Sequence, residues 1–434
     1  MRTTEDATAG CEPRRGRYYS SVIDRRTTRC RGVSGIYRIC LAVCTAVGLT
    51  LVPAASGAQP PGATPAVAPP VAPPAAGPAT TLPFFPLRVR WAADLDGPPA
   101  APAVTDGTRV FVPLSTGTLV AVDAETGATR WKAEVSTALR PAADSGHVYV
   151  VAGDALQALD AGSGAAAWRV PLPAPVSAPL VARAGWVLAA LETGEIVALR
   201  GADGTEVWRR HVGVPVVAPA AIDGDRLYLP GADGLVRAFT VSTGAPLWSR
   251  ALGGSIVSVA PLGARLYVGS TDNHFYCLDD RDGRVRWRWR AGADPVGTPI
   301  ADDERVYFSA LDTVLRALDR GHGAQRWRQP LPWRPRTGPI RVGNTIVAAG
   351  IALDLRGYAL DTGREIGEFA LTENRLEVLE GAPVLVARTT LPGDFLVAAI
   401  ADGRLIALEH VFGLPPVPLT TIPGERVALT PPPS

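Results

Sequence analysis

The feature that most constrains this chain is a tryptophan that recurs about every forty residues. The spacings between successive members of the series are 40, 37, 40, 40, 39 and 40, for Trp91, Trp131, Trp168, Trp208, Trp248, Trp287 and Trp327. From the second member on, each tryptophan lies four residues after a glycine, namely Gly127, Gly164, Gly204, Gly244, Gly283 and Gly323. Self-similarity at such a period indicates a repeat architecture, in which neighbouring units bury one continuous core.

The segment around each glycine is typical of a turn between two strands, as in AVDAETGATRW (121–131). A polar residue opens the turn by accepting backbone N–H bonds, and the glycine supplies positive φ. That polar residue is aspartate at Asp123, Asp160, Asp279 and Asp319. Two further short strands precede each segment, with alternating β-branched and aromatic residues bounded by Gly and Asp. Four strands per forty residues predict the blade of a β-propeller, with the tryptophan packing between neighbouring blades.

The expected fold class is therefore all-β, an eight-bladed β-propeller of four-stranded antiparallel blades. The blades are expected at 101–135, 138–173, 176–213, 216–253, 256–293, 296–332, 336–371 and 380–411. The seventh keeps Asp361 and Gly363 but has Phe369 near the tryptophan position. The eighth ends after LIALEH (405–410), without a fourth strand. LRVRWAAD (87–94) is a tryptophan strand with no blade before it, so we expect it to complete the eighth blade and remove the exposed edges.

The ends of the chain predict an exported protein. Residues 1–58 form a basic leader and signal peptide, whose apolar run 39–52 would rise about 21 Å as a helix, short of a bilayer core of about 30 Å. Small residues at 56–58 predict cleavage near Ala58. An uncleaved N-terminal membrane anchor stays open as the alternative. A Pro/Ala-rich linker follows at 59–85, then the propeller at 86–412 and a loose tail at 413–434.

The repeated motif, small-x-Asp-x-x-x-Gly-x-x-x-Trp, resembles the tryptophan-docking repeat of the PQQ-like, quinoprotein-type propellers, over about 86–412. It departs from that pattern at Arg200, Thr240 and Cys277. The resemblance implies that the tryptophans lock adjacent blades together. It also implies one of two functions. Quinone-dependent dehydrogenases bind pyrroloquinoline quinone and calcium at the propeller centre, whereas BamB-type outer-membrane assembly lipoproteins are scaffolds without a cofactor. Compact blades, and the lack of long insertions and adjacent cysteines, are similar to the second group.

Composition argues against several other classes. There are 43 Lys and Arg against 41 Asp and Glu, and nine arginines lie in the first 38 residues, so charge gives no support for nucleic-acid binding. Of five cysteines only Cys277 lies in the expected propeller, which excludes a disulfide framework there. The five histidines are scattered, which argues against zinc. We expect no catalytic residue, metal or cofactor, with a PQQ-dependent quinoprotein or small-ligand-binding propeller as the alternative.

One local feature exceeds what the repeat needs. In RWRWR (286–290) the two tryptophans share one face of a strand and the three arginines share the other. The set is completed by the next blade and the residues after it: Arg286, Arg288, Arg290, Arg326, Arg328, Arg334 and Arg336. These are either the ordinary solvated charges of outer strands or a docking patch for a protein partner. The predicted function is a non-catalytic, exported scaffold for protein–protein interaction in the periplasm or cell envelope, including outer-membrane protein assembly, touching membrane only through an uncleaved leader.

Overall fold

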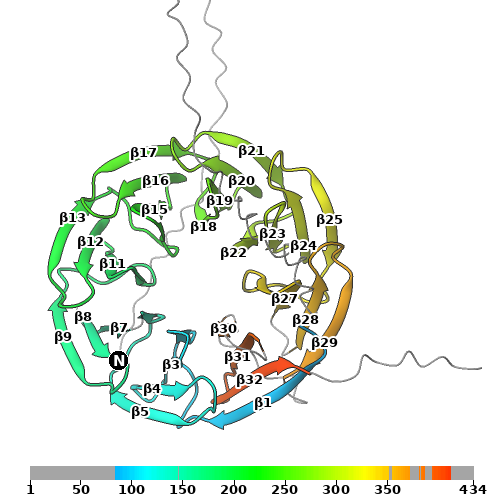
Figure 1. Cartoon of the computed structure of the whole chain (residues 1–434). Helices are drawn as coiled ribbons and strands as arrows, with labels where there is room; N and C mark the ends of the chain where they lie inside the picture. The colour runs from blue at the N-terminus through cyan, green and yellow to red at the C-terminus, as the bar shows by residue number, and fades with distance from the viewer. Residues whose placement is uncertain are drawn as a thin grey trace, which may run out of the picture. The chain divides into compact units, whose positions relative to one another are not determined.

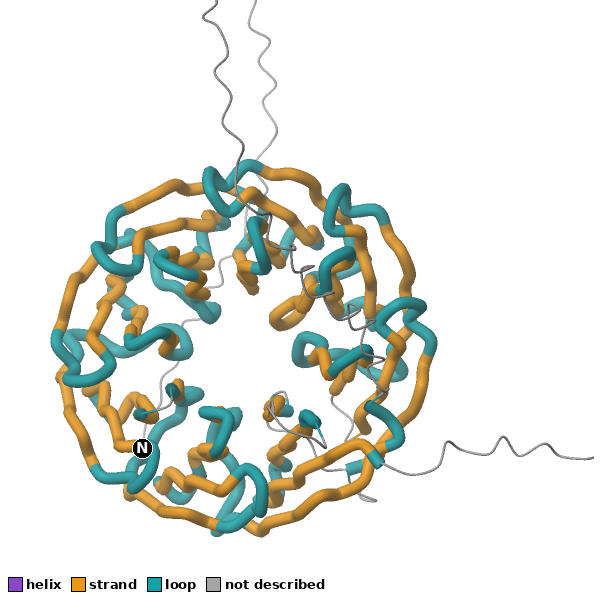
Figure 2. Tube along the Cα trace, in the orientation of Figure 1, coloured by secondary structure: helices purple, strands orange, loops and turns teal. Residues whose placement is uncertain are grey.

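A computed structural model of the chain describes residues 84–144, 146–350, 354–371, 381, 383–386 and 393–411. These residues form strands and turns, with no helix among them, and so none that could cross a membrane. The strands make eight four-stranded sheets arranged as blades around a ring (Figures 1 and 2). The eight-bladed β-propeller is thereby confirmed. The leader at 1–58, the linker up to residue 83 and the tail from 412 lie outside the described residues.

In seven blades the strands run in chain order from the inner edge of the ring to its outer edge, and in the eighth the outermost strand is β1 (Figure 1). Blades one to four comprise β2 (Val104–Thr105), β3 (Arg109–Pro113), β4 (Thr118–Asp123), β5 (Thr129–Glu134); β6 (Ala142–Ala143), β7 (His147–Ala152), β8 (Ala155–Asp160), β9 (Ala166–Pro171); β10 (Val181–Arg183), β11 (Trp186–Ala190), β12 (Glu195–Arg200), β13 (Glu206–His211); and β14 (Ala221–Asp223), β15 (Arg226–Pro230), β16 (Leu235–Thr240), β17 (Pro246–Ala251).

Blades five to eight comprise β18 (Ile256–Pro261), β19 (Arg265–Ser270), β20 (His274–Asp279), β21 (Val285–Arg290); β22 (Pro295–Ala301), β23 (Arg305–Ala310), β24 (Val314–Asp319), β25 (Gln325–Pro330); β26 (Ile340–Val342), β27 (Thr345–Ala349), β28 (Asp354–Ala359), β29 (Glu365–Ala370); and β30 (Val384–Val386), β31 (Phe395–Ala399), β32 (Arg404–His410), β1 (Leu87–Asp94). The second and third strands of each blade carry most of the buried side chains, and the hydrophobic clusters lie between neighbouring blades.

The ring closes through the N-terminal strand, as expected. β1 pairs antiparallel with β32, from Leu87 opposite His410 to Asp94 opposite Arg404, and the two lie side by side in Figure 1. The almost fully buried carboxylate of Glu409 forms ion pairs with the guanidinium groups of Arg90, at 2.6 Å, and Arg88, at 2.8 Å. Burial by itself would raise the pKa of Glu409, but the two guanidinium groups outweigh it and hold that pKa below its ordinary value. The closing strand is therefore fixed by charge-assisted hydrogen bonds as well as by its ladder.

Each tryptophan of the series docks onto the next blade. The indole N–H of Trp131 donates to the carbonyl oxygen of Ala161 at 3.0 Å, and that of Trp208 to Val241 at 2.6 Å. The same bond is made by Trp91, Trp168, Trp248, Trp287 and Trp327. The docked turn is the one that carries the repeated glycine. A Cβ atom added to Gly244, at φ +64°, would lie 2.6 Å from Trp208, so the glycine is required by both its conformation and the ring above it.

Blade seven differs from the sequence-based expectation. In the other blades the docking tryptophan lies opposite a small residue of the third strand, as Trp131 lies opposite Ala121. In blade seven that register places Gly367, not Phe369, opposite Gly357. The turn position held by aspartate in four other blades is Ala359, two residues before Asp361. The empty tryptophan site is filled by Phe85, whose ring lies against both glycines. Phe369 was therefore the wrong substitute, because the replacement comes from outside the repeats.

Candidate functional site

The structure divides the seven arginines between two parts of the fold. Five lie on the outer strands β21 and β25, which are neighbours in Figure 1: Arg286, Arg288, Arg290, Arg326 and Arg328. Arg334 and Arg336 lie instead in the connection from β25 to β26, where Pro335 between them bridges to Gly350 beside β27. All seven side chains are exposed. β25 ends at Pro330, so Arg334 and Arg336 follow the sixth blade and do not lie on its outer strand.

The two faces of β21 differ as the alternation predicted. Trp287 is buried, with 8% of its surface exposed, and Trp289 is half-buried. Both pack into the hydrophobic cluster between blades five and six, beside Phe275 and Phe308. The arginines at 286, 288 and 290 point the other way, toward solvent. The tryptophans therefore serve the core, and only the arginines are available at the surface.

Two of the outer-strand arginines are engaged within their own hairpin. Arg286 contacts Asp279 at 2.5 Å and Arg326 contacts Asp319 at 2.5 Å, each across the turn that opens with that aspartate. Arg130 and Asp123 make the same pair in blade one. Backbone N–H donation from Arg281 and then the guanidinium of Arg286 lower the pKa of Asp279, against the opposing effect of burial. These pairs belong to the repeat, and Arg286 and Arg326 are turn-fixing residues.

The other three outer-strand arginines form what we call the basic strip: Arg288 and Arg290 on β21 and Arg328 on β25. Within the described part of the chain none of the three makes an ion pair or a side-chain hydrogen bond. Arg328 lies opposite Arg316 in the ladder, and Arg316 is itself paired with Asp312. The charge of Asp312 is thus already balanced by Arg316. The basic strip presents uncompensated positive charge on two adjacent blades.

A polar cavity of about 620 Å³ lies where blades five and six meet. Its lining includes Arg265, Arg305 and Arg320 together with Asp303 and Glu304. Arg320 ties the two blades, since its Nε donates to the Tyr267 hydroxyl at 3.0 Å. Sequence reasoning missed this cavity. The available signal was the arginine that begins the second strand in several blades: Arg109, Arg226, Arg265 and Arg305.

The described residues show no ligand set for the calcium of the dehydrogenase alternative. No three His, Cys, Asp or Glu side chains among them are grouped to hold a metal ion. Cys277 is fully buried, and burial raises the pKa of its thiol to about 11, so it is a small core residue and not a nucleophile. The recurring turn aspartates accept hydrogen bonds from backbone N–H groups of the turn that follows them, as Asp160 accepts from the N–H of Ser163 at 2.8 Å. They are not a shared ligand set.

Comparison with known proteins agrees with the repeat. A family model described as "Outer membrane protein assembly factor BamB" matches residues 88–170, 153–262 and 232–411. Outer membrane protein assembly factor BamB of Yersinia pestis is 24% identical over 164 residues, which are 35% of this chain and 40% of that protein. The same factor of Alkalilimnicola ehrlichii is 34% identical over 132 residues, 30% of this chain and 31% of that protein. The matched stretches thus span less than half of these relatives.

Solved structures show the same fold. The crystal structure of BamB from Moraxella catarrhalis superposes with a TM-score of 0.61 at 21% identity, covering 76% of this chain and 99% of that one. A quinohemoprotein alcohol dehydrogenase from Comamonas testosteroni superposes with a TM-score of 0.59 at 14% identity, covering 76% of this chain and 77% of that one. Likeness at these identities concerns the fold alone. The family model, by contrast, accounts for almost the whole propeller, and the chain belongs to the family of PQQ-like repeat propellers described as outer membrane protein assembly factor BamB.

Proposed function

We propose that this chain is an exported, non-catalytic scaffold of the cell envelope that binds another outer-membrane assembly protein through the basic strip. Membership of the BamB family supports the assembly role. The observation that carries the docking surface is the exposed, uncompensated charge of Arg288, Arg290 and Arg328, on blades whose equivalent turn arginines are already paired. Positive charge of this kind steers an acidic partner and makes its binding depend on salt.

A matched pair of double variants tests the basic strip. Arg288 and Arg328 each lie one residue after a docking tryptophan, as do Lys132 and Arg169 on blades one and two. Arg288→Glu/Arg328→Glu should weaken partner binding by about 1–2 kcal/mol, or about five- to thirtyfold, and flatten its salt dependence. Lys132→Glu/Arg169→Glu should change it by less than about twofold. The measurement is the amount of cross-linked partner recovered from envelope extract at several salt concentrations.

Arg286 is left unchanged in this test, because a glutamate there would face Asp279 and disturb the turn. Equal recovery of partner with both double variants would mean that the basic strip is an ordinary solvated face. A visible absorbance scan of the purified protein separates the scaffold from a quinone-binding propeller. A bound quinone absorbs in that range, and its presence would favour the dehydrogenase-like alternative.

Export is tested by the N-terminus of the mature protein. After fractionation, the chain should be recovered from the periplasm or envelope and should begin near Gln59, because small residues precede that position. N-terminal sequencing or intact mass makes the measurement. An envelope-bound chain that retains residues 39–58 would show anchoring in place of cleavage. Full-length chain in the cytosol would contradict export altogether.

A further inference from the structure

The junction between blades seven and eight is built differently from the other junctions of the ring. In the first, fourth, fifth and sixth blades the second strand begins with arginine, but in blade seven it begins with Thr345, which is fully buried. The small third-strand residue that faces the docking tryptophan is alanine or cysteine elsewhere and Gly357 here. The tryptophan itself is replaced by Gly367. Gly357 and Gly367 depart from the repeat in this blade alone, and no other second strand of the described blades begins with threonine.

Each of the three positions contacts one of two adjacent residues, Phe84 or Phe85. The backbone N–H of Phe84 donates to the Thr345 hydroxyl at 2.8 Å. A Cβ atom at Gly357 would lie 2.3 Å from the Phe85 ring, and one at Gly367 would lie 2.7 Å from it. Neither glycine has positive φ, so each is needed for the space it leaves and not for its backbone conformation. Thr345, Gly357 and Gly367 thus form a notch shaped to the Phe84–Phe85 pair.

The aromatic pair is held on the other side by blade eight. His410 Nδ1 lies 3.1 Å from the carbonyl oxygen of Phe84, and the N–H of Val411 donates to the carbonyl of Pro86 at 3.0 Å. Phe84 and Phe85 are 4% and 3% exposed and meet edge to face, with ring centroids 6.1 Å apart. They join one hydrophobic cluster with residues of both blades, including Leu355, Leu396 and Leu408. The pair therefore bridges the seam.

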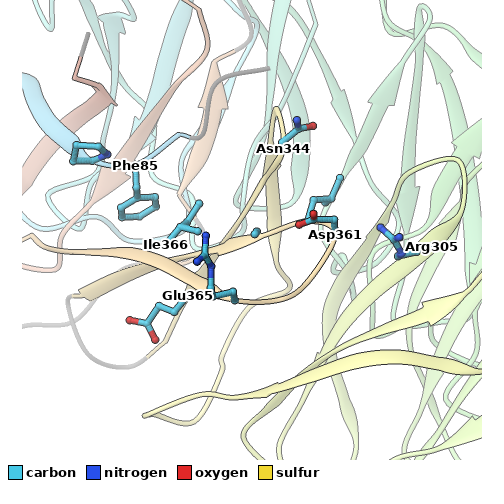
Figure 3. A pocket seen from close by; sticks show the side chains of 10 residues that line it. Phe85, Arg305, Asn344, Asp361, Glu365 and Ile366 are labelled. Atoms are coloured by element: carbon cyan, nitrogen blue, oxygen red, sulfur yellow. The ribbon is translucent and has the colours of Figure 1, made fainter. Parts of the chain in front are cut away.

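We propose that Phe84–Phe85 is a strap that fastens the seam between blades seven and eight. It takes the place of the missing docking tryptophan, so that the segment leading into the propeller controls closure of the ring. A cavity of about 700 Å³ lies beside the strap, with Phe85 and Ile366 on one side and Asn344 and Arg305 on the other (Figure 3). Because Phe85 forms part of this lining, release of the strap widens the cavity and opens the seam.

Hydrogen exchange on full-length variants tests the strap. Phe85→Ala should speed amide exchange in β1, β29 and β32 by at least about tenfold, and exchange in β11 and β12 of blade three by less than about twofold. Gly367→Trp alone should also speed exchange at the seam, because Phe85 already fills that space. In the double variant Phe85→Ala/Gly367→Trp, the exchange rate at the seam should return to within about threefold of that of the unmodified chain. The reason is that a tryptophan in this register is what docks each of the other blades onto its neighbour.

Phe369→Ala is the matched control. Phe369 packs against the same hydrophobic cluster without lying against either glycine, so Gly367→Trp should give it no rescue. If Phe85→Ala yields too little folded protein, Phe85→Leu makes the same comparison, with a threefold or greater acceleration confined to the seam. The proposal is overturned by unchanged exchange in Phe85→Ala, by equal acceleration in every blade, or by single-variant effects that simply add in the double variant.

Discussion

Deletion of residues 1–94, which removes β1, should lower the free energy of unfolding by about 5 kcal/mol or more. Loss of a buried tryptophan alone costs about 3–5 kcal/mol. This deletion removes the half-buried Trp91 and also the strand that carries it. It also leaves Glu409 without Arg88 and Arg90 and exposes the edge of β32. The free energy of unfolding of a single domain is only about 5–15 kcal/mol in total. Urea unfolding followed by circular dichroism should show a broad, early transition or aggregation.

The matched control is a chain that begins at Pro83. It lacks the leader and linker but keeps Phe84, Phe85 and β1. Its free energy of unfolding should therefore stay within about 0.5 kcal/mol of that of the mature protein. The comparison isolates residues 84–94, the Phe84–Phe85 strap together with the closing strand, from the segments before them. If the two truncated chains unfold at the same urea concentration, the strap and the fourth strand of blade eight together contribute little, and the ring is held by its remaining junctions.

The fold was predictable because the repeats act as an alignment of the chain with itself. Each glycine four residues before a tryptophan fixes a turn and a register, and the structure places Trp131 and Trp208 on the following turns as that register requires. Phe85 was not predictable in the same way, since it lies outside every repeat. The available signal was the missing tryptophan of blade seven. Gly367 stands four residues after Gly363, where a tryptophan was due, and this left a site for another aromatic ring.

The candidate site was only partly predictable. Strand alternation correctly separated Trp287 from the arginines, because side chains of a strand alternate between faces. It did not distinguish Arg286 from Arg288, although one faces a carboxylate and the other does not. The pairing depends on the hairpin, in which an aspartate lies seven residues before the arginine that reaches it. Arg130 and Asp123 share that spacing, so the repeat contained the signal.

Trp208→Ala should lower the free energy of unfolding by about 3–5 kcal/mol, the second large effect expected. Trp208 is among the most buried members of its series, at 8% exposed, and its indole N–H bonds to Val241 across the blade junction. Most of the loss should come from the ring. Trp208→Phe keeps a six-membered aromatic ring and should cost less than Trp208→Ala; the N–H bond that it loses is worth about 1 kcal/mol. Val207→Ala, at the exposed neighbouring position, should change stability by less than about 0.5 kcal/mol.

A double-mutant cycle with Gly244 then tests whether ring and glycine form one contact. Gly244→Ala places a methyl group 2.6 Å from the Trp208 ring at φ +64°, so overpacking of about 1–3 kcal/mol adds to left-handed strain of about 1–2 kcal/mol. In the Trp208→Ala background the methyl group has room, and only the strain should remain. The two changes should therefore couple by about 1–3 kcal/mol in urea unfolding. If Gly244→Ala costs the same with and without the ring, the repeated glycine serves the turn alone, and docking does not explain its place four residues before the tryptophan.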